Sequence, residues 1–152
     1  TQFNAIREQP YSILAIGAPG AVDELLLGDD RRPAPTQARF RFVHAAPSLS
    51  DTAVDVYLTL PGKAIDFNPD DDTDTTDDAA NLRQNSAIPF RSVGGYITLE
   101  GGTYDVYFAR AGENTTLVGP IPHDFPNGSV QTVALIDTLM GTLAVHAVDD
   151  TM

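Results

Sequence analysis

The chain has 152 residues and no cysteine, which excludes disulfide bonds and thiolate metal sites. Its 21 acidic residues outnumber 9 basic ones, and the resulting net charge of -12 opposes binding to nucleic acid or to an anionic membrane. No stretch approaches the roughly 20 consecutive apolar residues that a transmembrane helix requires, so we expect no membrane-spanning segment. The length suits one domain with its own core.

The first predicted element is a β-hairpin within residues 1–30, formed by the apolar runs 11–16 and 22–27 around Gly17-Ala18-Pro19-Gly20. A lone hairpin is marginally stable in water. We therefore expect it to dock on its own domain, on an upstream module or on a neighbouring molecule. The side chains that this docking would bury form a candidate assembly interface, namely Ile13, Leu14, Ile16, Val22, Leu25 and Leu27.

This hairpin resembles the end of the chain. Residues 12–30 align without a gap on residues 132–150, with Ile16 on Ile136 and Asp29-Asp30 on Asp149-Asp150. A repeat at this offset of 120 predicts the end of one module followed by one entire module. The start has no initiating Met and no signal-peptide pattern, so we expect Thr1 to be a processed or cut end.

Residues 31–37 are predicted to form a proline-rich linker, because closely spaced prolines stiffen a segment and cannot join a strand ladder. Residues 38–152 then show the period-two alternation of half-buried strands, for example over 39–44, 54–60 and 104–109. The run 130–136 is apolar on both faces, as in a covered central strand. Seven or eight short strands separated by Gly, Pro and Asn turns predict an all-β fold, an immunoglobulin-like antiparallel β-sandwich with an additional N-terminal β-hairpin.

An acidic loop over residues 66–85 interrupts the strands. Its carboxylates match the oxygen ligands of Ca²⁺, and the candidate ligands are Asp70, Asp72, Asp74, Asp77 and Asp78. Thr75 stands where an EF-hand loop needs Gly, so that geometry is not expected. A solvated, partly mobile loop is the alternative reading, and a short helix over residues 79–85 is a further one.

Other candidate sites carry weaker signals. His44, His123 and His146 are the three histidines, and two of them could form a transition-metal site if strands 39–46 and 142–149 were neighbours. The alternative is that His44, on the apolar face with Phe40 and Phe42, is a hydrogen-bonded core histidine. Tyr57 and Tyr107 are predicted on outer strand faces, where they could stack on sugars or pack on another sheet. Cross-strand stabilisation is the commoner role of tyrosines on strand surfaces. No Gly-x-Ser-x-Gly nucleophile elbow occurs, and we predict no catalytic residues and no cofactor other than calcium.

Several stretches carry a family resemblance. They are residues 38–47 (ARFRFVHAAP), 53–57 (AVDVY), 97–106 (ITLEGGTYDV) and 11–17 (YSILAIG). Together they resemble the hallmark motifs of the DUF4397 family of bacterial and archaeal surface proteins. The resemblance implies an immunoglobulin-like sandwich, often in tandem, exported to the cell surface, with an adhesive or structural role. It also implies that residues 1–30 are the tail of a preceding repeat. The extra residues 48–52 and the acidic insertion depart from the family pattern.

The expected function is that of a non-enzymatic structural or adhesive module, secreted or held at the cell surface. We predict head-to-tail self-association through the hairpin into a filament or surface array. One alternative is a fragment of a tandem-repeat surface adhesin. Another is a calcium-dependent module that binds a cell-surface glycan or protein through the Asp-rich loop, and an enzyme is the least motivated reading.

Overall fold

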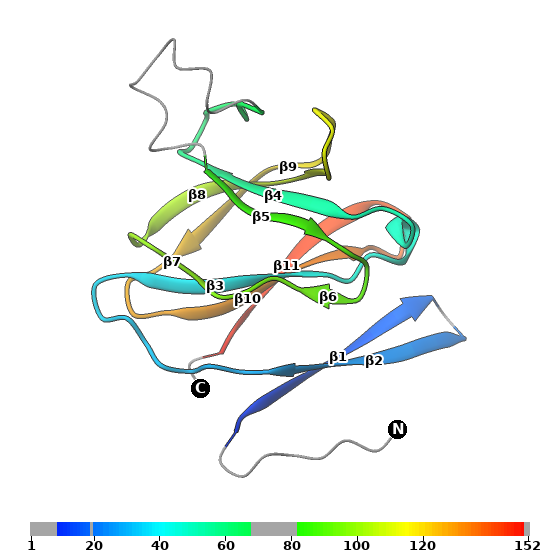
Figure 1. The fold of residues 1–152 in the computed structure, drawn as a ribbon, viewed down its shortest axis with the longest axis horizontal. Coiled ribbons are helices and arrows are strands. Elements are labelled where there is room, and N and C mark those ends of the chain that lie inside the picture. Colours follow the sequence, from blue (N-terminus) through cyan, green and yellow to red (C-terminus); the bar gives the residue numbers. More distant parts are fainter. Residues whose placement is uncertain (1–8, 19, 68–81, 151–152) are drawn as a thin grey trace.

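The computed structural model describes residues 9–18, 20–67 and 82–150, and it is an all-β sandwich with an attached hairpin (Figure 1). The hairpin consists of β1 (Tyr11–Ala18) and β2 (Ala21–Gly28). The sandwich strands are β3 (Ala38–His44), β4 (Val54–Thr59), β5 (Leu82–Ile88), β6 (Ser92–Val93), β7 (Ile97–Leu99), β8 (Gly102–Arg110), β9 (Thr116–Phe125), β10 (Val130–Asp137) and β11 (Leu143–Asp149). A single 3₁₀ turn, η1 (Pro47–Leu49), is the one helical element among the described residues.

Two sheets face each other in the sandwich. The first has the order β11-β10-β3, with β6 and β7 both paired to β3, and the second has the order β5-β4-β8-β9. The predicted all-β sandwich is therefore confirmed. Among these mostly antiparallel pairs, β3 and β10 run parallel, with Val133 opposite Phe42.

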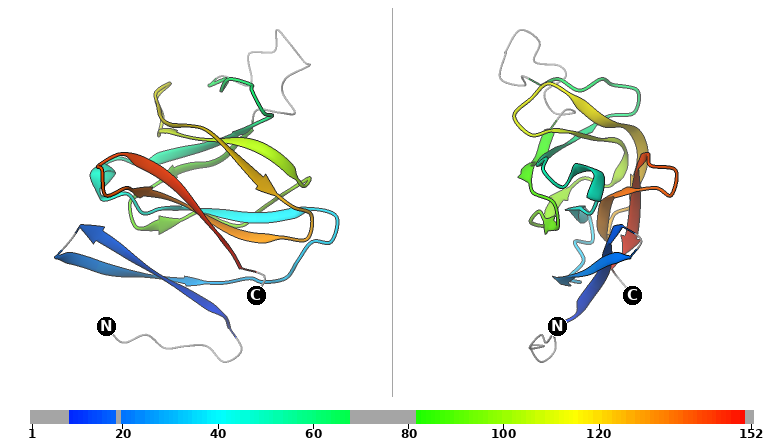
Figure 2. Two further views of the ribbon diagram at one scale, coloured as in Figure 1. Left: turned by 180° about the vertical axis from the view of Figure 1, so that it is seen from behind. Right: turned by 90° about the vertical axis from the view of Figure 1, so that its right-hand side faces the viewer.

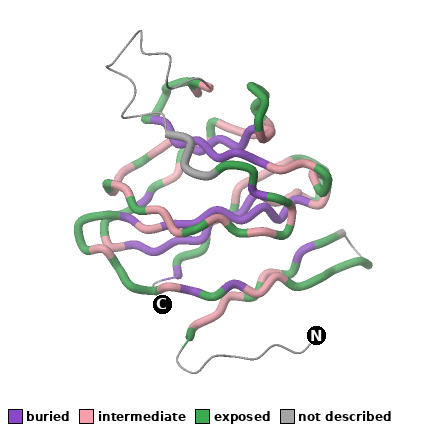
Figure 3. Tube along the Cα trace, viewed as in Figure 1, coloured by how far each residue is buried: buried purple, intermediate pink, exposed green. Residues whose placement is uncertain are grey.

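The core lies between the two sheets, where the inward positions of the alternating strands meet (Figure 3). Phe42 packs edge-on against Phe108 of the opposite sheet at 5.8 Å between ring centroids, and Phe40 packs against Phe125 at 4.5 Å. Val56 and Leu135 are buried in the same cluster. These contacts confirm the inward phase that the alternation predicted for β3, β4 and β8.

The outer face of the second sheet is also covered, which the sequence did not indicate. Tyr57 and Tyr107 are 4% and 7% exposed and pack with Ile65 and Phe67. The segment after β4 folds back over them, and the Tyr107 hydroxyl donates to the carbonyl of Lys63 (2.9 Å). The prediction that these tyrosines are exposed for sugar stacking is therefore wrong, whereas the alternative of a cross-strand pair is confirmed, because Tyr57 lies directly opposite Tyr107 in β4 and β8.

The acidic loop is shorter than predicted. Residues 82–85 belong to β5, which pairs with the edge of β4 through Leu58↔Leu82 and Val54↔Ile88. The predicted helix is therefore wrong for residues 82–85, because the edge of β4 supplies a strand partner there. Residues 68–81 lie outside the described residues.

The hairpin forms a third layer outside the first sheet, and Figure 2 shows it below the sandwich from two further directions. Residues 31–37, the predicted linker, connect it to β3 without belonging to any strand. The hairpin thus docks in cis, on the sheet of its own chain.

Candidate functional site

The face of the hairpin that meets the sandwich is apolar. Ile16 and Leu27 are 3% and 2% exposed and pack with Val43 of β3 and Ala134 of β10. Leu14, Leu25, Phe90 and Ile136 lie partly buried around them. This face is sufficient to explain why two strands that would be marginal alone stay folded.

Arg41 of β3 joins the base of the hairpin to the sheet. It is 2% exposed, forms an ion pair with Asp29, and donates from Nη1 to the carbonyl of Gly28 (2.8 Å). Its Nε donates to Thr132 Oγ1 (2.8 Å). A buried charge of this kind is tolerated because each polar group has a partner.

A second, more exposed set of contacts lies beside Arg41. Arg39 donates to Asp30 (3.0 Å), and Arg32 reaches the same carboxylate at 2.6 Å. Hydrogen bonds from Arg32 and Arg39 hold the pKa of Asp30 well below its usual range. The guanidinium groups of Arg39 and Arg41 lie 5.1 and 4.8 Å from the ring centre of Tyr96.

The ends of the two hairpins share a hydroxyl–carboxylate contact. In β1-β2, Ser12 Oγ donates to Asp29 Oδ2 (2.9 Å). In β10-β11, Thr132 Oγ1 donates to Asp150 Oδ2 (2.6 Å). Both carboxylates lie near Arg41, which is 3.8 Å from Asp150. Burial raises the pKa of Asp150.

The backbone closes both hairpins in the same way. The amide of Asp29 donates to the carbonyl of Pro10 (2.9 Å), and the amide of Asp150 donates to that of Val130 (2.7 Å). The first strands of the two hairpins, β1 and β10, therefore correspond at an offset of 120 residues, and the second strands, β2 and β11, correspond at an offset of 121. The extra residue lies in the turn, since two residues separate Ala18 from Ala21, while three separate Thr138 from its partner Thr142. The gapless alignment therefore matched Asp29 with the wrong aspartate, because it did not allow for the longer turn.

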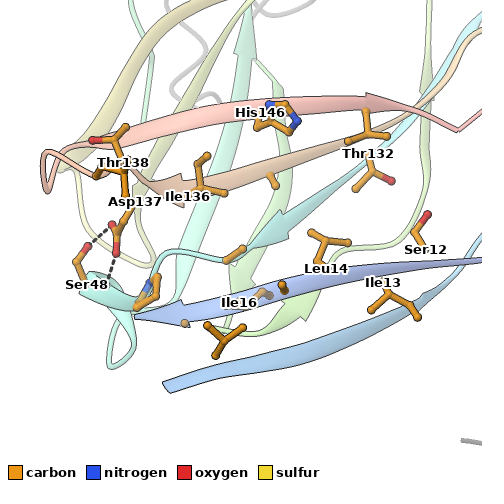
Figure 4. Close-up of a pocket in the computed structure, with 18 of the residues that line it drawn as sticks. Ser12, Ile13, Leu14, Ile16, Ser48, Thr132, Ile136, Asp137, Thr138 and His146 are labelled. Carbon is orange, nitrogen blue, oxygen red and sulfur yellow. Dashed lines mark hydrogen bonds between the residues drawn. The ribbon is translucent and has the colours of Figure 1, made fainter. Parts of the chain in front are cut away.

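A groove of about 890 Å³ lies between β1 and the outer face of β10 and β11. Figure 4 shows β1 and β10 running in the same direction along it, with Ser12 and Thr132 toward one end and Ile16 and Ile136 toward the other. At that second end, Ser48 donates to Asp137 from both its amide (2.8 Å) and its hydroxyl (2.6 Å). The groove thus has an apolar middle, which contains side chains that are equivalent between the two hairpins.

The six predicted interface residues divide between two faces. Ile16, Leu27, Leu14 and Leu25 lie against the chain's own sheet. Ile13 and Val22 are each 63% exposed on the opposite face. Self-association through these residues stays a prediction, while the docking of the first four within one chain is a finding.

The predicted calcium ligands all lie outside the described residues, namely Asp70, Asp72, Asp74, Asp77 and Asp78. Within the part of the chain that the structure describes, no three His, Asp or Glu side chains gather as a metal site would require.

The histidines lie apart, because β10 separates His44 on β3 from His146 on β11. His44 is buried, and its Nε2 lies 3.0 Å from the carbonyl of Thr52. His123 Nε2 lies 2.7 Å from Gln131 Oε1. The predicted alternative of a hydrogen-bonded core histidine describes His44.

The sequence did not lead us to predict a role for Arg41 in holding the hairpin. The signal was present, since two arginines occupy the outer positions of an otherwise apolar strand, and an Asp-Asp pair ends each hairpin. Charge alone does not reveal which carboxylate an arginine meets, because that depends on how distant strands pack.

No segment among the described residues forms a helix long and apolar enough to cross a membrane. No protein-family model matches the sequence, and no curated protein matches it significantly. The resemblance to DUF4397 therefore stays a prediction.

Proposed function

We propose that this chain is a non-enzymatic structural or adhesive module, secreted or held at the cell surface, that joins a neighbouring module through its N-terminal hairpin. The observation that carries the proposal is the hairpin itself. One of its faces is held by Arg41 and an apolar cluster, and the other presents Ile13 and Val22 to solvent. An element that is held on one side and apolar on the other suits a connector.

The high negative charge supports an external setting, where salt or divalent cations screen it. The repeated hairpin supports modular construction, since equivalent side chains make equivalent contacts at its two occurrences. Two arrangements fit this function. Separate copies join head to tail, or the modules follow one another in one longer polypeptide, as in a tandem-repeat adhesin.

Localisation tests the first part of the proposal. Antibodies against the full chain are applied to intact cells that express the native protein, followed by immunogold electron microscopy. We expect label on the outer surface or on extracellular material before any permeabilisation. Label that is seen after permeabilisation alone would contradict an extracellular role.

Light scattering and negative-stain microscopy of the purified chain separate the two arrangements. Filaments or concentration-dependent oligomers would support head-to-tail joining of separate copies. A sharp monomer at high concentration, together with a heavier native protein on immunoblots, would support modules within one polypeptide.

A further inference from the structure

We infer that the open edge of β1, which pairs with no strand among the described residues, and the outward face of the hairpin are the binding surface for a preceding module of the same fold, which lies face to face with this one. This surface comprises the β1 edge at Ile13 and Ala15 and the outward side chains of Ile13, Val22 and Leu26. The inference rests on the proposed function and specifies the partner. In it, β1-β2 is the closing hairpin of the preceding module, as β10-β11 closes this one.

The edge of β1 offers backbone groups in the pattern that β10 uses for β3. Ala15 is paired with Glu24, whose amide donates to the Asp23 carboxylate (2.8 Å) and so points away from β1. Ala15 and Glu24 are therefore a non-hydrogen-bonded antiparallel pair, in which the N–H and C=O groups of both residues point away from the partner strand. Ala15 thus presents its N–H and C=O groups on the edge of β1 that faces away from β2. Its equivalent Leu135 accepts there from the amide of Ala45 (2.8 Å), which follows β3.

The outward face corresponds to a face that is core in the second hairpin. Ile13 and Val22 are each 63% exposed, while their equivalents Val133 and Leu143 belong to the main core cluster. A preceding sandwich would cover Ile13 and Val22 in the same way. Glu24, which is exposed in this structure, is the one charged residue on this face, and its equivalent on β11 is Val145.

The groove supplies the room for the partner strand. β2 packs over β3 and β1 runs beside β10, so a strand added to the open edge of β1 would lie over the outer side of β11. Val148, 48% exposed, and His146 line the groove at that place. The added strand therefore covers β11 as β2 covers β3.

The contact that already exists is nearly symmetric. Leu14 and Ile16 belong to the same apolar cluster as Ala134 and Ile136, which are their own equivalents at an offset of 120. A patch that meets its own equivalent is the property of a two-fold interface. The pair of modules therefore closes on itself, because β3 of each one lies under the hairpin that closes the other.

The charges at the interface are complementary to such a partner. Arg41 forms a close ion pair with Asp29 and a longer one with the equivalent Asp150, at 3.8 Å. The Asp150 carboxylate also accepts hydrogen bonds from the Thr132 and Tyr96 hydroxyls. In the paired modules, the preceding module's equivalent of Arg41, on its β3-type strand, would form a close ion pair with Asp150, as Arg41 does with Asp29. A complete separate copy cannot supply that strand, since its own β10 already pairs with β3.

A two-module protein tests the inference. Residues 31–129 are placed directly before Pro10, and the chain from Pro10 onward is kept whole, so that the first module has β1-β2 as its only closing hairpin. We expect a compact monomer by small-angle scattering. We also expect the amides of Ile13 and Ala15 to exchange with solvent about 100-fold more slowly than in the single chain.

Two matched variants test whether the open edge of β1 pairs with the added module. Ala15→Pro removes the amide on the open edge, and Glu24→Pro removes the amide of the cross-strand neighbour on the far edge. In the two-module protein, Ala15→Pro should abolish the slow exchange at Ile13 and expose the added module to proteolysis. Glu24→Pro should do neither, and both variants should leave the single chain folded.

An added module that is degraded while residues 10–152 remain folded would overturn the inference. So would a folded pair in which Ile13 and Ala15 exchange as fast as in the single chain. Either result would leave the surface localisation untouched, so failure of this inference is distinguishable from failure of the proposed function.

Discussion

At the level of single residues, Arg41 joins the base of the hairpin to the sheet. Its ion pair with Asp29 is almost completely buried, with the two side chains 3% and 1% exposed. Arg32, by contrast, pairs with Asp30 while 86% exposed. The two pairs have the same chemistry in very different surroundings, which makes them a natural comparison.

Replacing Arg41 by Met should lower the free energy of unfolding by about 3–5 kcal/mol, because Asp29 is left charged and buried without its partner. Arg32→Met should cost less than about 1 kcal/mol, since exposed ion pairs contribute little. Urea unfolding at neutral pH measures both. Equal losses for the two variants would mean that Arg41 does not hold the hairpin in solution.

We expect His44 to make the stability of the protein sensitive to mild acid. Burial lowers its pKa below the ordinary value of 6.5. Its Nδ1 accepts from the Ala46 amide (3.4 Å), a contact that the protonated ring cannot make. Below pH 6.5 the unfolded chain therefore binds a proton that the folded protein does not, and stability falls by at most about 1.4 kcal/mol per pH unit.

His44→Gln should flatten the pH dependence of stability between pH 6.5 and pH 5, because the titrating ring is removed. The measurement is urea unfolding at several pH values. The matched control is His146→Gln on β11, which is exposed and should leave the wild-type slope in place. A slope that survives the loss of His44 would assign the acid sensitivity to other groups.

At the level of elements, the hairpin has one face that is core and one that is surface. Leu27→Ala should cost about 2–5 kcal/mol, because its side chain is 2% exposed and a cavity is left between β2 and β3. Ile13→Ala on the same hairpin should change stability by less than about 0.5 kcal/mol in the single chain. Urea unfolding distinguishes them, and a Leu27→Ala cost as small as that of Ile13→Ala would show that the hairpin does not dock in cis.

At the level of the whole molecule, the net charge of -12 opposes the compact state through self-repulsion. Raising NaCl from 0.05 to 0.5 M shortens the Debye length to a few ångströms, and we expect Tm to rise by about 2–4 °C. The buried Arg41 pair is shielded from this screening. A falling Tm would indicate that exposed ion pairs outweigh the repulsion.

Calcium at matched ionic strength serves as the control for that measurement. A further rise with calcium would support a specific site among the Asp residues of the acidic loop, whereas the same Tm as in NaCl would assign the effect to screening alone.

The sequence by itself determined most of the strands, the turns between them and the phase of the core, while residues 82–85 of β5 were expected as part of a loop. Alternation in β3, β4 and β8 is a local property, and any sheet that buries Phe42 and Val56 must turn Arg41 outward. The hairpin and its resemblance to the end of the chain could also be predicted from the sequence, because both depend on neighbouring residues and their spacing.

Only the tertiary structure decided what covers each outer face. It buried Tyr57 under the segment that follows β4, placed Leu27 over β3, and brought Asp29 and Asp150 together at Arg41. The physical reason is that a strand pattern specifies which side chains need cover but not which distant surface provides it. That choice depends on the packing of all layers at once, and it left the outward face of β1-β2 uncovered.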